Sequence, residues 1–400
     1  MTTRLDDLSE LFRRHVCQTS REPLGLVVTR ARGTTVWDAG GRAYLDLLAG
    51  MGVGNVGHAH PAVVRAIRRQ IRSYLHVAVY GEAVQQPQVE LARTLATLAP
   101  GDLSVVYFTN SGAEAVEGAL KTARKATGRR RLIAFDGAFH GDTFGALSVG
   151  GNPIYQQPFE PLLPAVERLP FDDLAALERI DTSVAGVIIE PVQGEAGVRV
   201  PSDGFLPALR ERCTAVGALL IADEVITGVG RTGKLFACEH WQVVPDVLVL
   251  AKALGGGMPL GAFVGRPEVM RTLSRDPPLA HVTTFGGHPV SCAAAIAAIG
   301  IVVRRQLAAR AARVGAMWLA QLRALSGGGL QNVRGKGLLL ALDFDNAEQT
   351  RRFVRRCYDR GVIVNWTLHR DTVVRLAPPL TIARAEVARA TAVMTEALQA

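Results

Sequence analysis

Lys252 is the residue whose type and position most directly suggest chemistry. It follows the apolar run VLVLA (247–251) and precedes Ala-Leu-Gly-Gly-Gly, and the chain has only four other lysines. Lysine is almost never buried without a partner. Burial lowers the pKa of its ammonium group, so that the neutral amine can attack a carbonyl carbon. The sequence therefore predicts a nucleophilic lysine at the end of a buried strand, with glycines that leave room for a ligand.

Carboxylates end two other apolar runs of the chain. Glu190 ends GVIIE and Asp223 ends LLIAD, about one βα unit before Lys252. Ligands of an open parallel sheet bind beyond the carboxyl ends of its strands. Acids at such positions are also often structural and paired with a loop backbone. A functional and a structural interpretation therefore both stay open for each of these two residues.

A third strand end carries small polar residues. The segment Thr109-Asn110-Ser111-Gly112-Ala113 ends an apolar run and opens a predicted helix, where free backbone N–H groups can bind an anion. The alternative is a simple helix cap, with Ser111 as N-cap and Glu114 as its partner. A Schiff-base lysine, a carboxylate for a pyridinium nitrogen and an anion site for a phosphate are the parts that pyridoxal phosphate needs.

Two glycine motifs imitate nucleotide-binding loops. GVGNVG (52–57) and GVGRTG (228–233) both match GxGxxG. The first has no strong strand before it and no acid about 20 residues after it, and the second leads into a poor helix. With Lys234 the second also imitates a P-loop, but Leu235 stands where Ser or Thr would hold magnesium. We therefore interpret both motifs as tight turns near a site.

The elements that position these residues follow an α/β pattern. Five nearly all-apolar runs alternate with helices or glycine loops, as in a parallel sheet buried on both faces: Val105–Thr109, Leu132–Phe135, Val187–Glu190, Leu219–Asp223 and Val247–Leu250. Helices are expected at 5–16, 61–75, 85–98 and 289–324, and a hairpin at 34–49. Further strands are expected at 337–344, 362–365 and 373–376.

Composition limits the possible classes of protein. Hydrophobic residues make up 48% of the 400 and charged residues 20%, which excludes a disordered or collagen-like chain. The net charge of +9 comes mostly from scattered arginines without a nucleic-acid-binding motif, so we expect a solvated surface rather than a nucleic-acid partner. No apolar run reaches membrane-spanning length. Five widely spaced cysteines without a CxxC indicate buried thiols in a reducing compartment, and the expected location is cytoplasmic.

The segment 219–262 resembles the signature of class III aminotransferases, which are pyridoxal-phosphate enzymes of fold type I. The resemblance extends over nearly the whole chain and is greatest to the acetylornithine/ornithine branch. Ordered blocks carry it, among them WDAGGRAYLDLLAG, GHAHP, FTNSGAEAVEGALKTAR, GAFHGDT, EPVQGEAGV, TTFGGHPVSCAAA and VVRLAPPLTI.

The resemblance implies a role for individual residues. Lys252 binds the cofactor as a Schiff base, and Asp223 keeps the pyridine nitrogen protonated. The resemblance further implies residues that hold the phosphate, residues that line the hydroxyl side of the ring, and Phe139, which stacks on the ring. These cofactor contacts are Ser111, Gly112, Ala113, Phe139, His140, Glu190, Val225 and Ile226. Thr284 is implied to contact the phosphate of the partner subunit's cofactor. The implied substrate contacts are Asp142, Glu195, Thr283 and Arg375, with Arg375 holding a carboxylate and Glu195 as its switchable partner.

Two positions depart from the pattern of that branch. Asp142 stands where FHGRT has an arginine that grips the donor's carboxylate, and Ile226 stands where DEVQTG has a glutamine that hydrogen-bonds the cofactor's phenolic oxygen. A lost hydrogen bond costs roughly 0.5–1.5 kcal/mol, so the second change is tolerable. The first change disfavours a carboxylate and favours an amine or neutral group at the far end of the donor, as in putrescine or cadaverine. The alternative is that the Asp142 side chain turns away from the donor and pairs with an arginine.

The expected fold is α/β, a type I pyridoxal-phosphate transferase with a large domain over 58–290 and a small domain over 291–400. Residues 1–57 are expected to form an N-terminal segment that packs with the small domain. The expected activity is transfer of an amino group, a terminal (ω) one, to a 2-oxo acid such as 2-oxoglutarate. An aminomutase or decarboxylase on the same fold and a non-enzymatic basic binding protein are the alternatives. The TTFGG loop follows the surface-like segment SRDPPLAH, so a homodimer with composite sites is expected.

Overall fold

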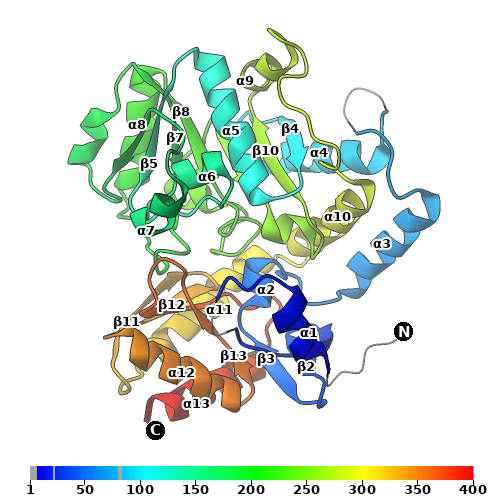
Figure 1. Ribbon diagram of the computed structural model, residues 1–400, viewed down its shortest axis with the longest axis vertical. Helices are drawn as coiled ribbons and strands as arrows, with labels where there is room; N and C mark the ends of the chain where they lie inside the picture. Colours follow the sequence, from blue (N-terminus) through cyan, green and yellow to red (C-terminus); the bar gives the residue numbers. More distant parts are fainter. Residues whose placement is uncertain (1–6, 21–22, 80–82, 400) are drawn as a thin grey trace.

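The computed structural model describes residues 7–20, 23–79 and 83–399. Figure 1 shows two parts, one built on a seven-stranded sheet between helices and one built on two four-stranded sheets. The first and the last described segments, 7–20 and 384–399, lie in the second part. The large site-bearing sheet therefore comes from the middle of the sequence, as the apolar runs predicted.

The central sheet has the strand order β4-β10-β9-β8-β7-β5-β6. The strands from β9 to β6 are parallel neighbours, whereas β10 is antiparallel to both β9 and β4. All five predicted strands form, but β6 and β10 were not predicted, because β6 (VERL) is half polar and β10 (GAFVG) is short and bounded by glycine. The bounds are β4 Val105–Thr109, β5 Arg131–Phe135, β6 Val166–Leu169, β7 Val184–Ile189, β8 Leu219–Asp223, β9 Val247–Leu250 and β10 Gly261–Gly265.

Helices cover the faces of this sheet. Helix α5 (Gly112–Thr127) begins at Ser111, whose Oγ accepts from the backbone N–H of Glu114 at 3.1 Å, and it ends at Gly128, which has φ +68°. Its buried face is mostly alanine, which lets the helix lie close to the strands. The other longer helices of this part are α3 Pro61–Ser73, α4 Gln86–Leu98, α8 Phe205–Val216 and α10 Pro289–Arg304. Shorter helices are α6 Phe144–Ser148, α7 Pro153–Gln156 and α9 Pro267–Met270.

The second part joins segments from both ends of the chain. One of its sheets has the strand order β1-β2-β3-β13, in which β13 is parallel to β3. The bounds are β1 Val28–Arg32, β2 Thr35–Asp38, β3 Ala43–Asp46 and β13 Val362–Ile363. The other sheet has the order β11-β12-β15-β14. Its bounds are β11 Leu330–Lys336, β12 Leu339–Phe344, β15 Val373–Leu376 and β14 Asn365–Trp366, and the helices are α1 Leu8–His15, α2 Ala49–Gly52, α11 Leu307–Arg323, α12 Ala347–Asp359 and α13 Arg384–Gln399.

The second part contains the predicted hairpin but differs from the prediction in its helices. The predicted hairpin at 34–49 is confirmed as β2 and β3. The helix expected at 289–324 is two helices, because Gln306 has φ +49° between α10 and α11. Leu5, the first residue of the helix expected at 5–16, lies outside the described residues. The limits of the three expected domains stay a prediction.

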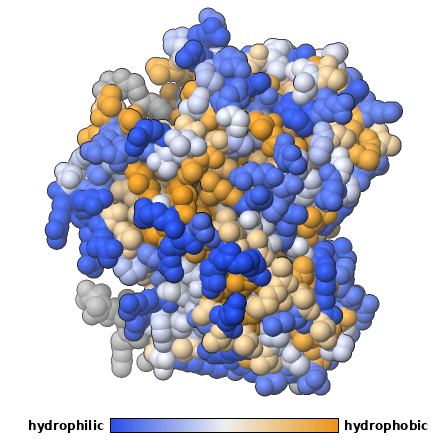
Figure 2. All heavy atoms as spheres, turned by 180° about the vertical axis from the view of Figure 1, so that it is seen from behind, coloured by the Kyte–Doolittle hydropathy of each residue, from blue (hydrophilic) through white to orange (hydrophobic). Residues whose placement is uncertain are grey.

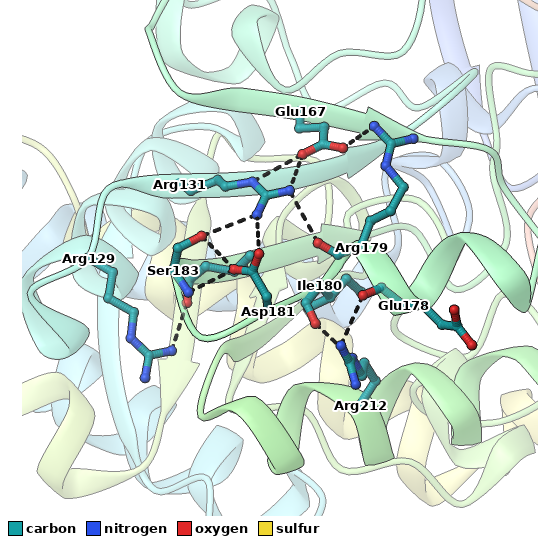
Figure 3. Close-up of polar contacts among 10 residues, drawn as sticks. Arg129, Arg131, Glu167, Glu178, Arg179, Ile180, Asp181, Ser183 and Arg212 are labelled. Atoms are coloured by element: carbon teal, nitrogen blue, oxygen red, sulfur yellow. Dashed lines mark hydrogen bonds and ion pairs between the residues drawn. The ribbon is translucent and has the colours of Figure 1, made fainter.

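Polar side chains at the amino end of the central sheet form a closed network (Figure 3). Arg131, at the start of β5, donates to Glu167 of β6 from two nitrogens and to Asp181 at 3.0 Å. Its guanidinium also donates to the backbone oxygen of Arg179 at 3.2 Å, while the Arg179 side chain pairs with Glu167. Nearby, Arg212 of α8 donates to Ile180 O at 2.7 Å. Charges at this end thus hold strand ends together.

Two arginines of the chain are buried and so do not belong to the solvated surface. Arg231 and Arg375 are 0% and 1% exposed. Arg231 donates to Asn55 Oδ1 and to the backbone oxygens of Leu338 and Pro378, so its buried charge has polar partners. Asn55 and Arg231 lie in the two GxGxxG motifs, which therefore meet each other as turns.

Two further expectations concern the cysteines and a membrane. Four of the five free cysteines are buried as expected, whereas Cys17 is exposed. Within the described ranges no single helix is long and apolar enough to cross a membrane, although α10 and α11, bent by 61°, pass that test of length and composition as a pair. The cytoplasmic location stays a prediction.

Candidate active site

A cavity of about 390 Å³ lies at the carboxyl ends of the central strands. It is where the sequence predicted a ligand site, because parallel strands present their following loops at one edge. Eleven of the residues singled out in the sequence line it: Ser111, Gly112, Ala113, Phe139, His140, Glu190, Glu195, Asp223, Val225, Ile226 and Lys252. Val53, Asn110, Gly141, Gly194, Ala251, Gly257, Met258, Pro259 and Leu260 complete the lining.

Lys252 follows β9 and begins a short 3-10 helix, Lys252–Gly255. Its φ of +45° lies in the left-handed region, which is uncommon for a residue with a side chain and is typical of functional sites. Burial lowers the pKa of its ammonium group, while the charge of Glu195 opposes that change. No ion pair to Lys252 occurs among the described residues. Its amine is therefore available to a ligand in the cavity.

Asp223 is held in place by two donors at the end of β8. Its Oδ2 lies 2.7 Å from His140 Nδ1, and its Oδ1 accepts from the backbone N–H of Val225 at 3.0 Å. The 2.7 Å distance fits a hydrogen bond between the imidazole Nδ1 and the carboxylate, which only accepts. His140 Nε2 is buried without a hydrogen-bond partner in the described part of the chain. The pair presents a fixed carboxylate to the cavity, as a pyridinium nitrogen requires.

The amino terminus of α5 forms another wall of the cavity through Ser111, Gly112 and Ala113. A Cβ at Gly112 would lie 3.0 Å from Val225 Cγ1, so a side chain would crowd the loop after β8. The Ser111 hydroxyl caps the helix through Glu114, and Glu114 Oε2 accepts from Asn110 N and Nδ2 at 2.8 Å. The structure shows the helix cap, and it is compatible with anion binding because a capped helix N-terminus still presents N–H groups; the phosphate contact stays a prediction.

Glu190 follows β7 and is 3% exposed. Its two oxygens accept one backbone hydrogen bond each, from Phe139 N and from Gly194 N, both at 2.9 Å. Burial raises the pKa of its carboxyl to about 7; the charge of His140 and the two backbone bonds oppose this, and Asp223 adds to it. Glu190 thus anchors the loop that carries Phe139 and also lines the cavity.

Glu195 and Arg375 form a buried ion pair, but Arg375 itself does not line the cavity. Burial acts to raise the pKa of Glu195, and the charge and hydrogen bond of Arg375 outweigh it, so that the pKa is lowered. The second oxygen of Glu195 accepts from Leu368 N at 2.8 Å, and Arg375 Nη2 lies 3.8 Å from Met51 Sδ. Glu195 thus stands between Arg375 and the cavity.

Besides Arg375, three predicted site residues lie away from the cavity lining. Asp142 is exposed, and its charge acts on Tyr155 and on His369. Thr283 Oγ1 accepts from Asn110 Nδ2 and from Gly286 N, both at 3.2 Å. Thr284 is exposed. The roles of these residues stay predictions.

Tyr155 and His369 are two residues near the site that the sequence did not indicate. The His369 ring lies 5.2 Å from the ring of Tyr155 and 5.7 Å from the ring of Phe139. Its Nδ1 lies 3.1 Å from Gly137 O, and the Tyr155 hydroxyl donates to Leu368 O at 2.8 Å. Tyr155 lies in the single-turn helix α7 and His369 in a loop, and long-range contacts join them, so no periodicity could have marked them.

Comparisons with known proteins identify the family. The model of the family "Aminotransferase class-III" matches residues 16–398. The acetylornithine aminotransferase of Methanopyrus kandleri is 46% identical over 98% of this chain and 99% of its own. The putrescine aminotransferase of Pectobacterium atrosepticum is 45% identical over 91% of this chain and 81% of its own.

The fold leads to the same family. A solved ornithine aminotransferase from Toxoplasma gondii with partial occupancy of pyridoxal phosphate at its active site superposes with a TM-score of 0.91. It is 33% identical, over 99% of this chain and 94% of its own. The predicted type I fold and the predicted cofactor, pyridoxal 5'-phosphate, are confirmed. Because this family consists of enzymes, the alternative of a non-enzymatic basic binding protein is wrong. The chain belongs to the class III aminotransferases.

Proposed function

We propose that this aminotransferase takes an ω-amine donor whose far end carries an amine or a neutral group, such as putrescine or cadaverine. Asp142 carries the proposal: it is exposed beside Tyr155 and His369, and within the described ranges it has no ion-pair partner. The alternative of an Asp142 paired with an arginine therefore loses support. A free carboxylate there attracts a distal ammonium and repels a distal carboxylate. That one relative is named for putrescine agrees with this choice.

The proposed roles of the chain's residues follow from their geometry. Bound pyridoxal phosphate supplies an aldehyde that accepts the amino group and a ring that absorbs the electron pair left on the donor carbon. Lys252 Nζ, whose pKa burial lowers, removes the proton from that carbon and later returns one. Asp223 keeps a proton at the ring nitrogen, and Ser111, Gly112 and Ala113 hold the phosphate.

The acceptor is proposed to be a 2-oxo acid, 2-oxoglutarate in particular. Glu195 neutralises the buried Arg375 while the amine donor is bound. The carboxylate of the acceptor then replaces Glu195 and makes a planar two-point contact with the guanidinium. One site can thereby receive both a cationic and an anionic substrate.

The donor proposal is tested by Asp142→Arg. We expect kcat/KM for putrescine to fall relative to N-acetylornithine by about tenfold, because the reversal of charge acts at an exposed position where water screens part of it. Asp102→Arg, before β4 at the far end of the sheet, makes the same change of charge and should leave this ratio unaltered. A wild-type enzyme that prefers N-acetylornithine to every diamine would contradict the proposal.

We further propose a homodimer in which Thr284 contacts the phosphate of the partner subunit's cofactor. The loop that carries Thr284 is fixed to its own chain by Tyr107, which donates to His281 O at 2.8 Å, and by Lys125, which donates to Asp276 O at 2.9 Å. The loop nevertheless exposes apolar side chains, 61% of Val282 and 53% of Phe285. Figure 2 shows apolar side chains gathered between charged ones on one face of the molecule. A rigid apolar loop of this kind suits a second copy of the chain.

A hybrid of two inactive variants tests the composite site. Lys252→Ala removes the lysine from one chain, and Thr284→Glu repels the phosphate held by the other. Mixed dimers should regain activity, because one of their two sites then combines a normal Lys252 with a normal Thr284. Mixed dimers without activity, or an active monomer by light scattering, would refute the proposal.

A further inference from the structure

Glu190 is a buried acid whose two oxygens are only partly satisfied. Each oxygen accepts one backbone hydrogen bond, from Phe139 N or from Gly194 N, and the side chain borders the cavity. If the carboxyl is protonated, its O–H needs an acceptor. The structure shows none among the described residues, so this part of the carboxyl is open to a molecule bound in the cavity that it borders.

The cavity has two distinct sides. Val225 and Ile226 follow each other in the loop after β8, and each lies at a different side. Val225 approaches Gly112 at the amino terminus of α5. Ile226 approaches Gly194, where an added Cβ would lie 3.1 Å from its Cγ2. The side that faces away from the helix terminus is therefore formed by Ile226, Gly194 and Glu190. Ile226 has no polar atom, so Glu190 offers the polar side chain there.

The chemistry of pyridoxal phosphate relates these sides to its substituents. The phosphate-bearing and the phenolic carbons lie on opposite edges of its ring. With the phosphate at the terminus of α5 and the ring nitrogen at Asp223, the edge that carries the phenolic oxygen faces the side of Glu190 and Ile226. That oxygen is an acceptor, which is the group that a protonated Glu190 lacks.

Burial favours the neutral form of Glu190 below pH 7. Burial is the largest influence and raises its pKa to about 7, and the charge of Asp223 acts in the same direction. His140 opposes them, and Lys252 is the other charged group that acts on this carboxyl. A carboxyl with a raised pKa keeps its proton below that pKa and loses it as the pH rises.

We propose that Glu190 is a neutral carboxylic acid that donates its O–H to the phenolic oxygen of bound pyridoxal phosphate, where Ile226 can make no hydrogen bond. The proton stays on Glu190, so the contact orients and stabilises the cofactor without a transfer. Ionisation of Glu190 at higher pH turns a donor into a carboxylate that faces the phenolic oxygen. The affinity for the cofactor then falls. The proposal is independent of the identity of the amine donor.

The test measures binding of 4-deoxypyridoxine 5'-phosphate to the cofactor-free full chain between pH 6 and pH 9. This probe has the phenolic oxygen, the ring nitrogen and the phosphate but no aldehyde, so Lys252 cannot bond to it. Ile226→Gln adds an amide that donates to the phenolic oxygen with one N–H and to an ionised Glu190 with the other. The ratio of the wild-type Kd to the Ile226→Gln Kd cancels the titration of the probe itself.

We expect this ratio to rise by about tenfold between pH 6 and pH 8.5, the value of one hydrogen bond to a charged group. Ile226→Leu has no donor and should keep the wild-type profile. A ratio that does not change with pH would overturn the proposal.

Infrared spectra of the holoenzyme provide a second measurement, which does not depend on the variants at position 226. At pH 6.5 the difference spectrum between the wild type and Glu190→Gln should contain a protonated carboxyl stretch; Glu224, whose pKa burial also raises, is present in both proteins and cancels. A difference spectrum without that band would also overturn the proposal.

Discussion

The two ends of the central sheet use charge in opposite ways. At the amino end, Arg131 makes contacts with Glu167, Asp181 and the backbone of Arg179, so that each charge has a partner from a neighbouring strand or loop. At the carboxyl end, Lys252 makes no ion pair with any described residue, and His140 Nε2 has no partner.

The difference separates charges that serve the fold from charges that serve chemistry. A closed network satisfies its own donors and acceptors, and its loss costs stability. Groups that stay unsatisfied in a dry cavity cost stability to bury but are available to a ligand. The proximity of Glu224 to Asp223 shows that burial alone does not distinguish the two kinds. Glu224 accepts from Thr227, Ala237 and Cys238 and thereby holds the loop after β8.

The largest expected effect is that of Lys252→Ala at the carboxyl end. Turnover should fall by about 10³-fold or more, because the group that moves the proton is lost. The melting temperature should not fall, because the lysine makes no ion pair that the fold could lose. Lys234→Ala, at an exposed lysine, is the matched control and should keep full turnover.

Asp223→Asn should have a smaller but still large effect on catalysis. An amide cannot hold a proton at the ring nitrogen by charge, and we expect turnover to fall by about 10²–10³-fold. The His140 contact makes some loss of stability possible as well, so thermal unfolding should be measured beside kcat. Turnover within a factor of two of the wild type would contradict the role of this carboxylate.

The smallest catalytic effect is expected at the amino end. Arg131→Ala should lower the free energy of unfolding by about 1–3 kcal/mol, because Glu167 and a backbone oxygen lose a charged donor. Its kcat and KM should stay those of the wild type. Arg130→Ala, at the exposed neighbour, should change neither quantity. A loss of turnover in Arg131→Ala without a loss of stability would contradict the assignment of the amino-end charges to the fold and of the carboxyl-end charges to the chemistry.

The sequence could predict the carboxyl-end site because its residues end apolar runs. Parallel strands bring such ends to one edge, so Lys252, Asp223, Glu190 and Ser111 could be placed together before any contact was known. Strand β6 was not predicted because half of its residues are polar: Glu167 takes part in the amino-end network, and Arg168 donates to Gln156.

Features fixed by long-range contacts could not be predicted in the same way. Tyr155 of the short helix α7 meets His369 of a loop from a distant part of the chain, and Arg231 joins Asn55 across 176 positions. None of these pairs leaves a periodic pattern. Arg375 and Glu195 were predicted as site residues only through the resemblance to the family. By residue type alone, an arginine and a glutamate indicate an ion pair exposed to solvent.

Reduction of the holoenzyme with borohydride, followed by peptide mapping, identifies the lysine that holds the cofactor. Reduction fixes the cofactor to that lysine. We predict a single labelled peptide that contains Lys252. A label on Lys121, Lys125, Lys234 or Lys336 would contradict it, because the unpaired lysine at the carboxyl end would then not be the residue that serves the chemistry.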